Sequence, residues 1–458
     1  MVDPLPSPEF GTSGLRGLAD ALTDDLVAAY VAAFARISEH DGTLVMGRDL
    51  RSSSPRIADS VARGAATAGL KVLDCGVVPT PALAMAALAR PTIAVMVTGS
   101  HIPADRNGLK FYSARGEITK ADEAALVAEV AKNVSVRAKT PEIEPLDAFG
   151  AYVARYVDAF GPRALQGMKI GLWEQSSAAR EVLRAILEGL GGEVIGLEPL
   201  ERFEAVDTEA VGGALREKLE GWVATHSLDA IVSTDGDGDR PLLADAGGKV
   251  VPGDILGPIT ARVLTADTIV TPISANTLVD LMGDFAIHKT RIGSPYVIAG
   301  METVGTDAKV LGYEPNGGVL LGFETANGLS PLMTRDSALP IVAVLSAAKG
   351  GSVAGLVEAL PARRTATDRL QDVPRAASDV LVARLIAGDL SVLPDGLGEL
   401  AGVDTTDGAR MTFESGVIVT LRPSGNAPEL RVYVEAGSDA EARALLAEAL
   451  ERVRSAIS

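Results

Sequence analysis

The chain has 458 residues, of which 47% are hydrophobic and 22% charged, so it can build packed cores but is too long for one, because single cores stop growing at roughly 250 to 300 residues. Its 48 glycines and 25 prolines follow no repeating period, which excludes a collagen-like or largely disordered chain. A formal net charge of −18 argues against nucleic acids and anionic membrane surfaces as partners.

Targeting and membrane segments are not expected. No apolar stretch reaches the length of about 20 residues that a membrane-spanning helix needs. The first ten residues, MVDPLPSPEF, lack the basic and apolar segments of a secretory leader, and the single Cys75 cannot form an internal disulfide. We therefore expect a cytoplasmic protein that does not insert into a membrane.

Five short β-branched, apolar runs are each followed by a Gly- or Ser-rich loop and then by helical periodicity. We expect strands at 43–47, 92–97, 168–173, 229–233 and 268–273. This alternation is typical of an α/β fold, in which functional residues lie in loops just past the carboxyl ends of strands. Polar or proline-containing breaks predict domains at 1–145, 146–250, 251–365 and 366–458.

The last predicted domain has a different, α+β pattern. An apolar run at 417–421 leads through a loop to 430–435, where apolar and polar residues alternate and so occupy opposite faces of a strand. Ser438 followed by Glu441 is a capping-box signature, and apolar residues then recur at helical spacing to Ile457. We predict an amphipathic helix that covers a small sheet.

Ser100 and His101 follow the second apolar run, in the segment TGSHIP. Neighbouring side chains of an extended chain point to opposite sides, so we expect His101 to be badly placed as a base for Ser100. The segment also lacks the G-x-S-x-G pattern of many serine hydrolases. A serine hydrolase is therefore disfavoured, and the serine alone is more typical of a turn.

Asp235, Asp237 and Asp239 alternate with glycine in DGDGDR, directly after the run at 229–233. Carboxylates this close repel one another, and a hard divalent cation such as Mg²⁺ is the usual compensation. A calcium loop is excluded, because Arg240 stands where that loop needs glycine and Ala246 where it needs glutamate. The motif alone fits either a metal site or a solvated acidic turn.

Two further loops carry groups suited to a sugar phosphate. In GYEPNGG, Glu314 and Asn316 sit among glycines that let the chain approach a ligand closely. In RPSGNAPELR, a guanidinium, a hydroxyl and backbone amides together match the needs of a phosphate. The groups are those of Arg422, Ser424, Gly425 and Asn426, with Arg431 as a second guanidinium. Either loop, read alone, is equally consistent with a plain turn.

Taken in order, FGTSGLRG, TGSHIP, DGDGDR, GYEPNGG and RPSGNAPELR resemble the α-D-phosphohexomutase family, which includes phosphomannomutases, phosphoglucomutases and phosphoglucosamine mutases. The flanking segments GRDLRSSS, GVVPTPA and NGLKF agree, and the resemblance covers nearly the whole chain. It implies an α/β protein with four-domain phosphohexomutase architecture, in which three related mixed α/β domains precede a smaller α+β C-terminal domain.

The resemblance also implies roles for individual residues. Ser100 matches the family's phosphoserine and, with Asp235, Asp237 and Asp239, its Mg²⁺ ligands. The expected catalytic residues are Ser100, Arg16, Lys110 and His101. The expected substrate-binding residues are Arg240, Lys289, Glu314, Asn316, Arg422, Ser424, Gly425, Asn426 and Arg431, with Lys289 resting on a looser match.

The implied reaction is reversible phosphoryl transfer between the 1- and 6-positions of a hexose phosphate, with Mg²⁺ as cofactor and a hexose 1,6-bisphosphate as intermediate and activator. Mannose phosphates are favoured as substrates, and phosphoglucomutase and phosphoglucosamine mutase are the alternatives. Two departures matter. Several relatives have histidine where this chain has Gly318, so Lys110 or another group must move the proton, and Asn426 replaces a common threonine.

Two functions of other classes remain open. A metal-dependent phosphatase would use the same serine and aspartates, but such enzymes usually need more metal ligands than four scattered histidines provide. A sugar-phosphate-binding protein without catalysis is the other alternative, which the intact Ser100 and the three aspartates make less attractive. Release of inorganic phosphate would identify the first, and any turnover would exclude the second.

Overall fold

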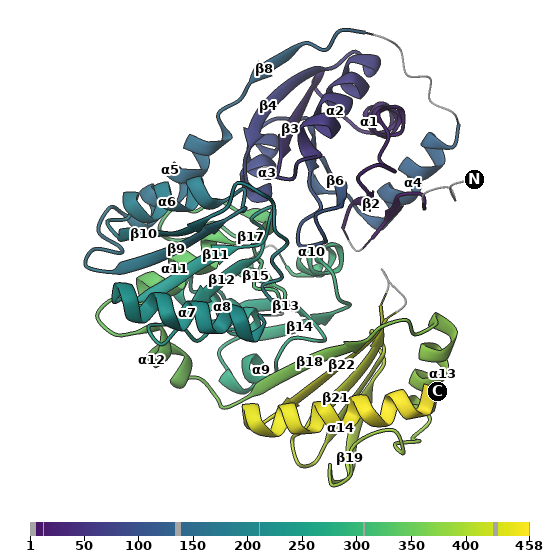
Figure 1. Cartoon of the computed structure of the whole chain (residues 1–458), viewed down its shortest axis with the longest axis vertical. Helices are drawn as coiled ribbons and strands as arrows, with labels where there is room; N and C mark the ends of the chain where they lie inside the picture. Colours follow the sequence, from purple (N-terminus) through teal and green to yellow (C-terminus); the bar gives the residue numbers. More distant parts are fainter. Residues whose placement is uncertain are drawn as a thin grey trace.

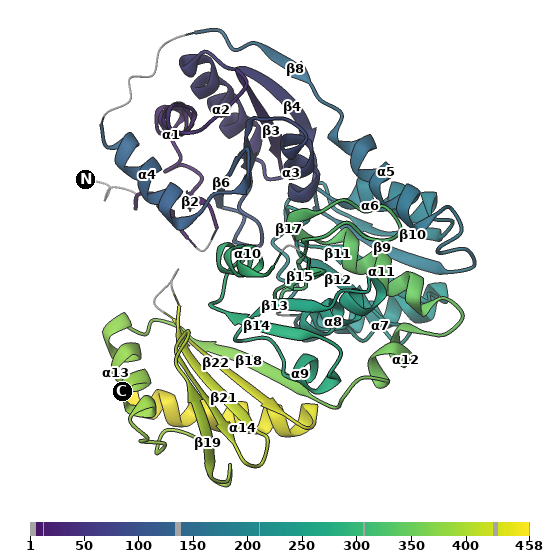
Figure 2. The ribbon, with the colours of Figure 1, turned by 180° about the vertical axis from the view of Figure 1, so that it is seen from behind.

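The structure, a computed structural model, describes residues 6–11, 13–132, 139–209, 211–305, 307–424 and 429–457. Within these residues the chain forms four β-sheets with helices packed on them. Figure 1 shows the first and fourth sheets at opposite ends of the molecule, with the second and third side by side between them, and the view from behind in Figure 2 gives the same order. The mixed α/β architecture expected from the sequence is confirmed.

The first sheet has the strand order β1-β2-β6-β5-β3-β4-β8, with β7 paired to β6. Its strands are β1 (Glu9–Phe10), β2 (Leu15–Leu18), β3 (Thr43–Arg48), β4 (Lys71–Val77), β5 (Ile93–Val97), β6 (Arg106–Ser113), β7 (Gly116–Glu117) and β8 (Ile143–Pro145). Its helices are α1 (Asp24–Ile37), α2 (Ser54–Ala68), α3 (Thr80–Leu88) and α4 (Lys120–Val130). In β5, Val95 and Val97 pack into the core under α1 and α2, while Ala94 and Met96 join the core on the opposite face, as alternation along a strand requires.

The second and third sheets have the orders β10-β9-β11-β12 and β14-β13-β15-β16-β17. Around the second lie β9 (Lys169–Gln175), β10 (Glu193–Pro199), β11 (Ala230–Thr234), β12 (Pro241–Ala244), α5 (Ala148–Phe160), α6 (Arg180–Gly189) and α7 (Gly213–His226). Around the third lie β13 (Thr268–Pro272), β14 (Ala286–Thr290), β15 (Val310–Tyr313), β16 (Val319–Leu321), β17 (Leu332–Asp336), α8 (Gly253–Val263), α9 (Leu278–Met282), α10 (Ser294–Thr303), α11 (Ala338–Ala348) and α12 (Val353–Glu358). One continuous hydrophobic cluster, which includes Val45, Leu183 and Ile341, joins these two sheets to the first.

The fourth sheet is antiparallel throughout, has the order β18-β22-β21-β20-β19, and builds a separate core. Its elements are β18 (Arg364–Leu370), β19 (Leu400–Asp404), β20 (Ala409–Phe413), β21 (Ile418–Pro423), β22 (Leu430–Ala436), α13 (Arg375–Ile386) and α14 (Asp439–Ile457). The predicted amphipathic helix is confirmed as α14. The alternation in β22 differs at one position, because Glu435 is buried against Thr277 of the third sheet instead of facing solvent.

The strands predicted from the sequence agree with the structure within two residues at each end. The predicted boundary between residues 365 and 366 falls inside β18, which begins at Arg364. The capping box at the start of α14 is only half formed: the Ser438 hydroxyl accepts from the Glu441 N–H, whereas the Glu441 carboxylate accepts from Gly437. No helix within the described residues combines the length and the apolar character that crossing a membrane requires.

Candidate active site

Ser100 lies just past the end of β5, in a loop that meets the acidic loop following β11. Its side chain is fully buried, and its hydroxyl donates a hydrogen bond of 2.7 Å to Oδ2 of Asp235. Two motifs 135 residues apart in the sequence therefore meet through this contact. Because β5 and β11 belong to different sheets, the two loops meet where the first and second sheets adjoin.

The expected separation of Ser100 and His101 is wrong. Ser100 is not extended but has φ +52°, in the left-handed region, so the two adjacent side chains lie on the same side. Oγ of Ser100 is 3.3 Å from Nδ1 of His101. The positive charge of Arg240, followed by burial, lowers the pKa of His101 well below its usual value, so the imidazole is neutral.

Arg51 supports the loop that carries Ser100, a role that the sequence did not predict. Its buried guanidinium donates to four backbone carbonyls of the loop between Ser100 and Arg106, at 2.6 to 2.8 Å, and Nε lies 3.2 Å from Asp49. A Cβ on Gly99 would lie 2.7 Å from Cζ of Arg51, so this position needs glycine. The segment GRDLRSSS was the available signal, because it contains a charge pair directly after a buried strand.

Asp235, Asp237 and Asp239 are buried, and one carboxylate oxygen of each lies within 4.8 Å of the other two. Lys110 donates to Asp237 and to Asp239 at 2.6 Å each, and Thr80 donates to Asp237 at 2.7 Å. Oδ1 of Asp237 and Oδ1 of Asp239 are buried without a hydrogen-bond donor among the described residues. Because a buried charged oxygen without a partner is costly, these free oxygens fit a hard cation, and the trio could hold a metal ion.

The charges around the trio are closely balanced. Burial, and then the neighbouring Asp237 and Asp239, raise the pKa of Asp235 well above its usual value. Burial acts to raise the pKa of Asp237 as well, but the ion pair with Lys110 outweighs it and leaves that pKa below its usual value. Burial and the nearby Arg240 lower the pKa of Arg16 to about 10, so Arg16 is still a cation at neutral pH.

Arg16 and Lys110 come from neighbouring antiparallel strands. Arg16 of β2 pairs with Gly108 of β6, two residues before Lys110, which makes the two basic side chains diagonal neighbours on one face. A third cation, Arg240, follows the acidic trio directly. Its Nε lies 4.0 Å from both Asp235 and Asp239, and its Nη1 lies 3.4 Å from Glu209.

Arg335, on β17, is a site residue that the sequence analysis missed. Its buried guanidinium donates to Asp239 at 2.7 and 3.2 Å and to Glu314 at 3.1 Å, so it bridges the acidic trio and the predicted sugar loop. Its stem occupies the space beside Gly318, where a Cβ would lie 2.8 to 2.9 Å from three of its carbons. Position 318 therefore has no room for a side chain while Arg335 is in this place.

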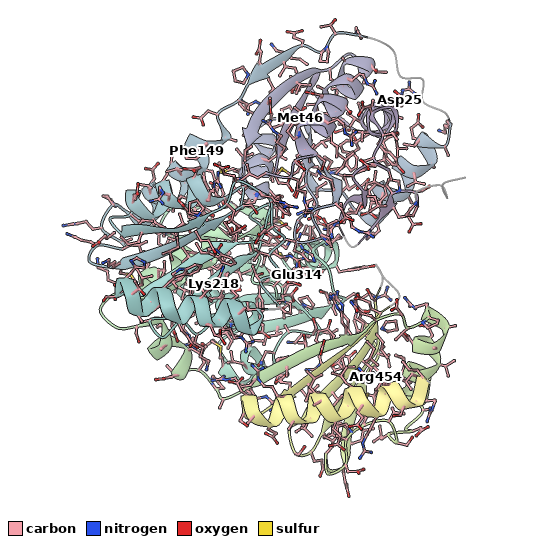
Figure 3. All side chains as sticks on the ribbon, in the orientation of Figure 1. Asp25, Met46, Phe149, Lys218, Glu314 and Arg454 are labelled. Carbon is pink, nitrogen blue, oxygen red and sulfur yellow. The ribbon has the colours of Figure 1, made fainter. Side chains whose placement is uncertain are left out.

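The residues after Arg335 fix the end of β17. Asp336 accepts hydrogen bonds from the hydroxyls of Tyr152, at 2.6 Å, and Tyr156, both on α5. Ser337 donates to the carbonyl oxygen of Gly238 in the acidic loop at 2.6 Å. Arg335 thus stands on a strand end that is anchored to two other parts of the molecule. In Figure 3, the labelled Glu314 lies near the middle of the molecule, between the first and the fourth sheets.

Two more of the predicted substrate residues, Asn316 and Lys289, lie in the segments that form the third sheet. Asn316 is buried, and its side-chain oxygen accepts from the Gly318 N–H at 3.0 Å, which shapes the sugar loop. Lys289 on β14 forms an ion pair of 3.1 Å with Asp280, and burial lowers its pKa. None of its described contacts joins it to Ser100.

The predicted phosphate clamp is on the fourth sheet. Arg422 and Arg431 are direct partners on β21 and β22, so their side chains leave the same face of the fourth sheet. Ser424 is buried at the end of β21. Gly425 and Asn426 lie outside the described residues. Nε of Arg422 is 3.1 Å from Oδ1 of Asp407 in the turn between β19 and β20.

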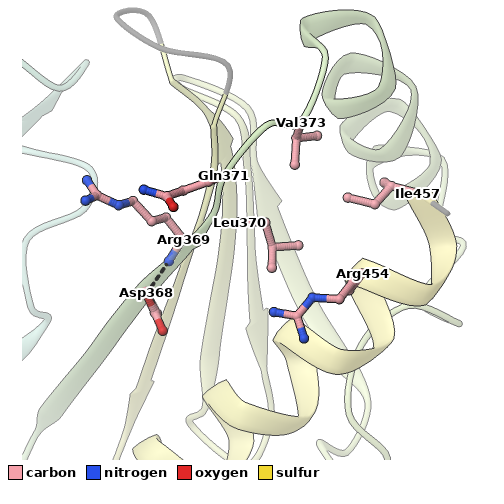
Figure 4. A pocket seen from close by; sticks show the side chains of 7 residues that line it. All are labelled: Asp368, Arg369, Leu370, Gln371, Val373, Arg454 and Ile457. Carbon is pink, nitrogen blue, oxygen red and sulfur yellow. Dashed lines mark hydrogen bonds between the residues drawn. The ribbon is translucent and has the colours of Figure 1, made fainter.

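A shallow hollow on the fourth sheet lies outside this site. It is lined by Asp368, Arg369, Leu370, Gln371, Val373, Arg454 and Ile457. Figure 4 shows Arg369 and Gln371 on one side of β18 and Leu370 on the other, facing Ile457. Its lining consists of apolar side chains at the margin of the fourth sheet's core and of charged side chains that face solvent. It contains none of the predicted site residues.

Comparison with known proteins gives one consistent result. Residues 7–137 match a family model described as phosphoglucomutase/phosphomannomutase, alpha/beta/alpha domain I, and residues 362–452 match the C-terminal domain of the same group. A phosphomannomutase of Sinorhizobium fredii is 43% identical over 98% of this chain and 99% of its own length. A phosphomannomutase of Salmonella muenchen is 39% identical over 97% of this chain and 95% of its own length.

Solved structures share the whole architecture. A phosphoglucomutase/phosphomannomutase family protein of Burkholderia thailandensis superposes with a TM-score of 0.78 over 97% of both chains. Its sequence is 21% identical, so this similarity concerns the fold alone.

Proposed function

This chain belongs to the α-D-phosphohexomutase family, and from that premise we propose that it interconverts mannose 1-phosphate and mannose 6-phosphate. It is an intramolecular phosphotransferase of the isomerase class. The preference for mannose is supported by the names of the two relatives at 43% and 39% identity, since a phosphoglucosamine mutase of Salinispora tropica is only 31% identical.

The observation that carries the proposed mechanism is the buried contact between the Ser100 hydroxyl and Asp235 within the acidic trio. We assign Ser100 as the residue that carries the phosphoryl group. Phosphorylated Ser100 and the three aspartates would hold Mg²⁺, which supplies positive charge to the transferring phosphoryl group. Arg16, Lys110 and Arg240 surround the same position and stabilise the charge on its oxygens.

In the first half-reaction, the bond between phosphorus and Ser100 Oγ breaks while a bond from phosphorus to a sugar hydroxyl oxygen forms. The hydroxyl proton leaves the sugar as this bond forms. Lys110 is held by two carboxylates, and these ion pairs outweigh burial and raise its pKa, so it remains a cation and does not accept the proton. His101, whose Nδ1 lies 3.3 Å from Ser100 Oγ, stands beside the leaving oxygen, so its neutral imidazole is placed to protonate Ser100 as the phosphoryl group departs, while the sugar proton passes to solvent or to a phosphate oxygen.

The product of that step is a hexose 1,6-bisphosphate, which turns over and returns its other phosphate to Ser100. One phosphate clamp must therefore accept both ends of the sugar phosphate. Arg422 and Arg431, which are ladder partners on the separate fourth sheet, suit this role, because a unit with its own core can move relative to the rest. Glu314, held by Arg335, and Asn316 are assigned to the sugar hydroxyls.

A coupled assay over mannose, glucose and glucosamine 1-phosphates, with Mg²⁺ and a hexose 1,6-bisphosphate, tests the proposal. We expect the largest kcat/KM with mannose 1-phosphate and no net release of inorganic phosphate. Ser100→Ala should lose nearly all activity while remaining folded, and Ser113→Ala, which removes a hydroxyl at the end of β6, is the matched control. A larger kcat/KM with another hexose contradicts the substrate, and stoichiometric phosphate release contradicts the mutase.

A further inference from the structure

Asp407, in the turn between β19 and β20, contacts two parts of the molecule at once. Oδ1 lies 3.1 Å from Nε of Arg422 in the predicted phosphate clamp. Oδ2 accepts a hydrogen bond of 3.0 Å from the backbone N–H of Ile292, in the loop between β14 and α10. A single carboxylate therefore joins the clamp to the third sheet.

The turn is shaped to bring this carboxylate close to Arg422. Gly408 has φ +95°, and a Cβ there would collide with the carbonyl oxygen of Leu421 and lie 3.1 Å from Cα of Arg422. Only glycine lets the turn pass this near to β21. Ala409 is the antiparallel ladder partner of Leu421, so Gly408 comes opposite Arg422 and Asp407 lies one residue further along the turn.

The contact between Asp407 and Arg422 has the properties of an ion pair that another anion can displace. The side chains are 21% and 13% exposed, so solvent reaches both. Although the atoms are close, the N–H of Arg422 Nε is not directed into a hydrogen bond with any described residue. The pair therefore lacks the bidentate geometry that makes arginine–carboxylate contacts strong, whereas a phosphate can present several oxygens to the same guanidinium.

We infer that Asp407 is a displaceable counter-ion of the phosphate clamp, which holds Arg422 when no phosphate is bound and competes with phosphate for it. This inference rests on the proposed function, in which Arg422 binds the non-reacting phosphate. The bisphosphate must leave the clamp and return reversed in every cycle. A carboxylate that competes for Arg422 makes the phosphate-bound state of the clamp less stable and so speeds release of the phosphate. Asp407 is a positioning residue, because it acts on Arg422 and not on the reacting atoms.

The loop that Asp407 binds is itself hydrogen-bonded to the first sheet. Ser294, two residues after Ile292, donates to Glu117 of the first sheet at 3.1 Å. Glu117 also accepts from Ser13, in the segment that leads to Arg16. The loop between β14 and α10 therefore connects Asp407, and through it Arg422, to the sheet that carries Ser100.

Asp407→Asn separates the charge from the docking contact, because an amide oxygen still accepts the Ile292 N–H. Calorimetric titration of the full chain with inorganic phosphate, mannose 1-phosphate and mannose 6-phosphate should show about two- to fivefold tighter binding, the range expected from a partly exposed ion pair. KM should fall with it, and kcat should also fall because release slows. Asp404→Asn is the matched control, since the exposed Asp404 on the same hairpin accepts the Thr406 N–H, a contact that asparagine preserves, and has no ion pair among the described residues.

Equal or weaker phosphate binding by Asp407→Asn overturns the inference, and tighter binding with an unchanged kcat overturns the role in release. Asp407→Ser, which also lacks the charge, must tighten binding in the same way if the asparagine variant does not fold. Arg422→Ala distinguishes failure of the proposed phosphate clamp from failure of the counter-ion inference. If it leaves phosphate binding intact, the proposed clamp is wrong, whereas if it weakens binding and Asp407→Asn fails to tighten it, only the counter-ion inference is wrong.

Discussion

Gly318→Ala should disable the site by displacing Arg335. Contacting carbon atoms normally lie about 3.5 to 4.0 Å apart. A Cβ at residue 318 would lie 2.8 Å from Cγ and Cδ and 2.9 Å from Cβ of Arg335, so the arginine would have to retreat by most of an ångström. Its three donor contacts, at 2.7 and 3.2 Å to Asp239 and 3.1 Å to Glu314, cannot all survive that shift.

Overpacking of this kind costs about 1 to 3 kcal/mol of folding free energy. A displacement of about 1 Å at a catalytic centre can cost on the order of a hundredfold in rate, so we expect kcat to fall roughly ten- to hundredfold. Gly402→Ala is the control, because no atom lies within 4 Å of the added methyl group on the exposed strand β19. Steady-state kinetics and denaturant unfolding of both variants give the two quantities.

A double-mutant cycle tests whether Arg335 is the cause. Arg335→Ala removes Cγ and Cδ, two of the three atoms that the new methyl group would strike, so Gly318→Ala should cost less stability in that background than in the wild type. The reasoning is refuted if Gly318→Ala is as active as the wild type, or if it costs the same unfolding free energy with and without Arg335.

Three other predictions follow from the structure. Removal of divalent metal with EDTA should abolish turnover, and added Mg²⁺ should restore it. Asp237→Asn should stay inactive at any Mg²⁺ concentration. Full turnover by metal-free enzyme would exclude the metal site. Burial and the nearby Glu435 raise the pKa of Asp254 to about 7, so the folded state binds the extra proton and unfolding free energy should fall as pH rises from about 4 to about 7. Asp254→Asn should remove that decline, which urea unfolding of both proteins across this range would reveal as a pH-dependent difference. Gly221→Ala, at an exposed interior position of α7 with open space around it, should raise the unfolding free energy by about 0.5 to 1 kcal/mol, and a decrease in the urea midpoint would contradict the helix assignment.

The sequence predicted those features that depend on local pattern. The runs at 43–47 and 268–273 became strands because β-branched side chains at that spacing suit buried sheets, and the acidic trio and Ser100 could be identified because they follow such strands directly. The helix α14 was equally predictable, since its apolar stripe extends over several turns.

The missed features depend on contacts between residues far apart in the sequence. Arg335 has site partners 96 and 21 residues away, and nothing in its own segment indicates that Gly318 leaves room for its stem. The approach of His101 to Ser100 depends on the left-handed backbone conformation of Ser100, which the composition of the loop does not predict. Glu435 alternates like a surface residue, yet it is buried because Thr277 and Arg363 of neighbouring segments cover it.

The central claim is that Ser100 carries the transferred phosphoryl group. Incubation of the full-length protein with Mg²⁺ and a hexose 1,6-bisphosphate labelled in its phosphates, followed by intact-mass analysis and peptide mapping, tests it most directly. The account predicts one added phosphoryl group on Ser100, which is passed on when unlabelled mannose 1-phosphate is added, and no labelling of Ser100→Ala. Turnover of mannose 1-phosphate by enzyme that never carries phosphate on Ser100 would contradict it.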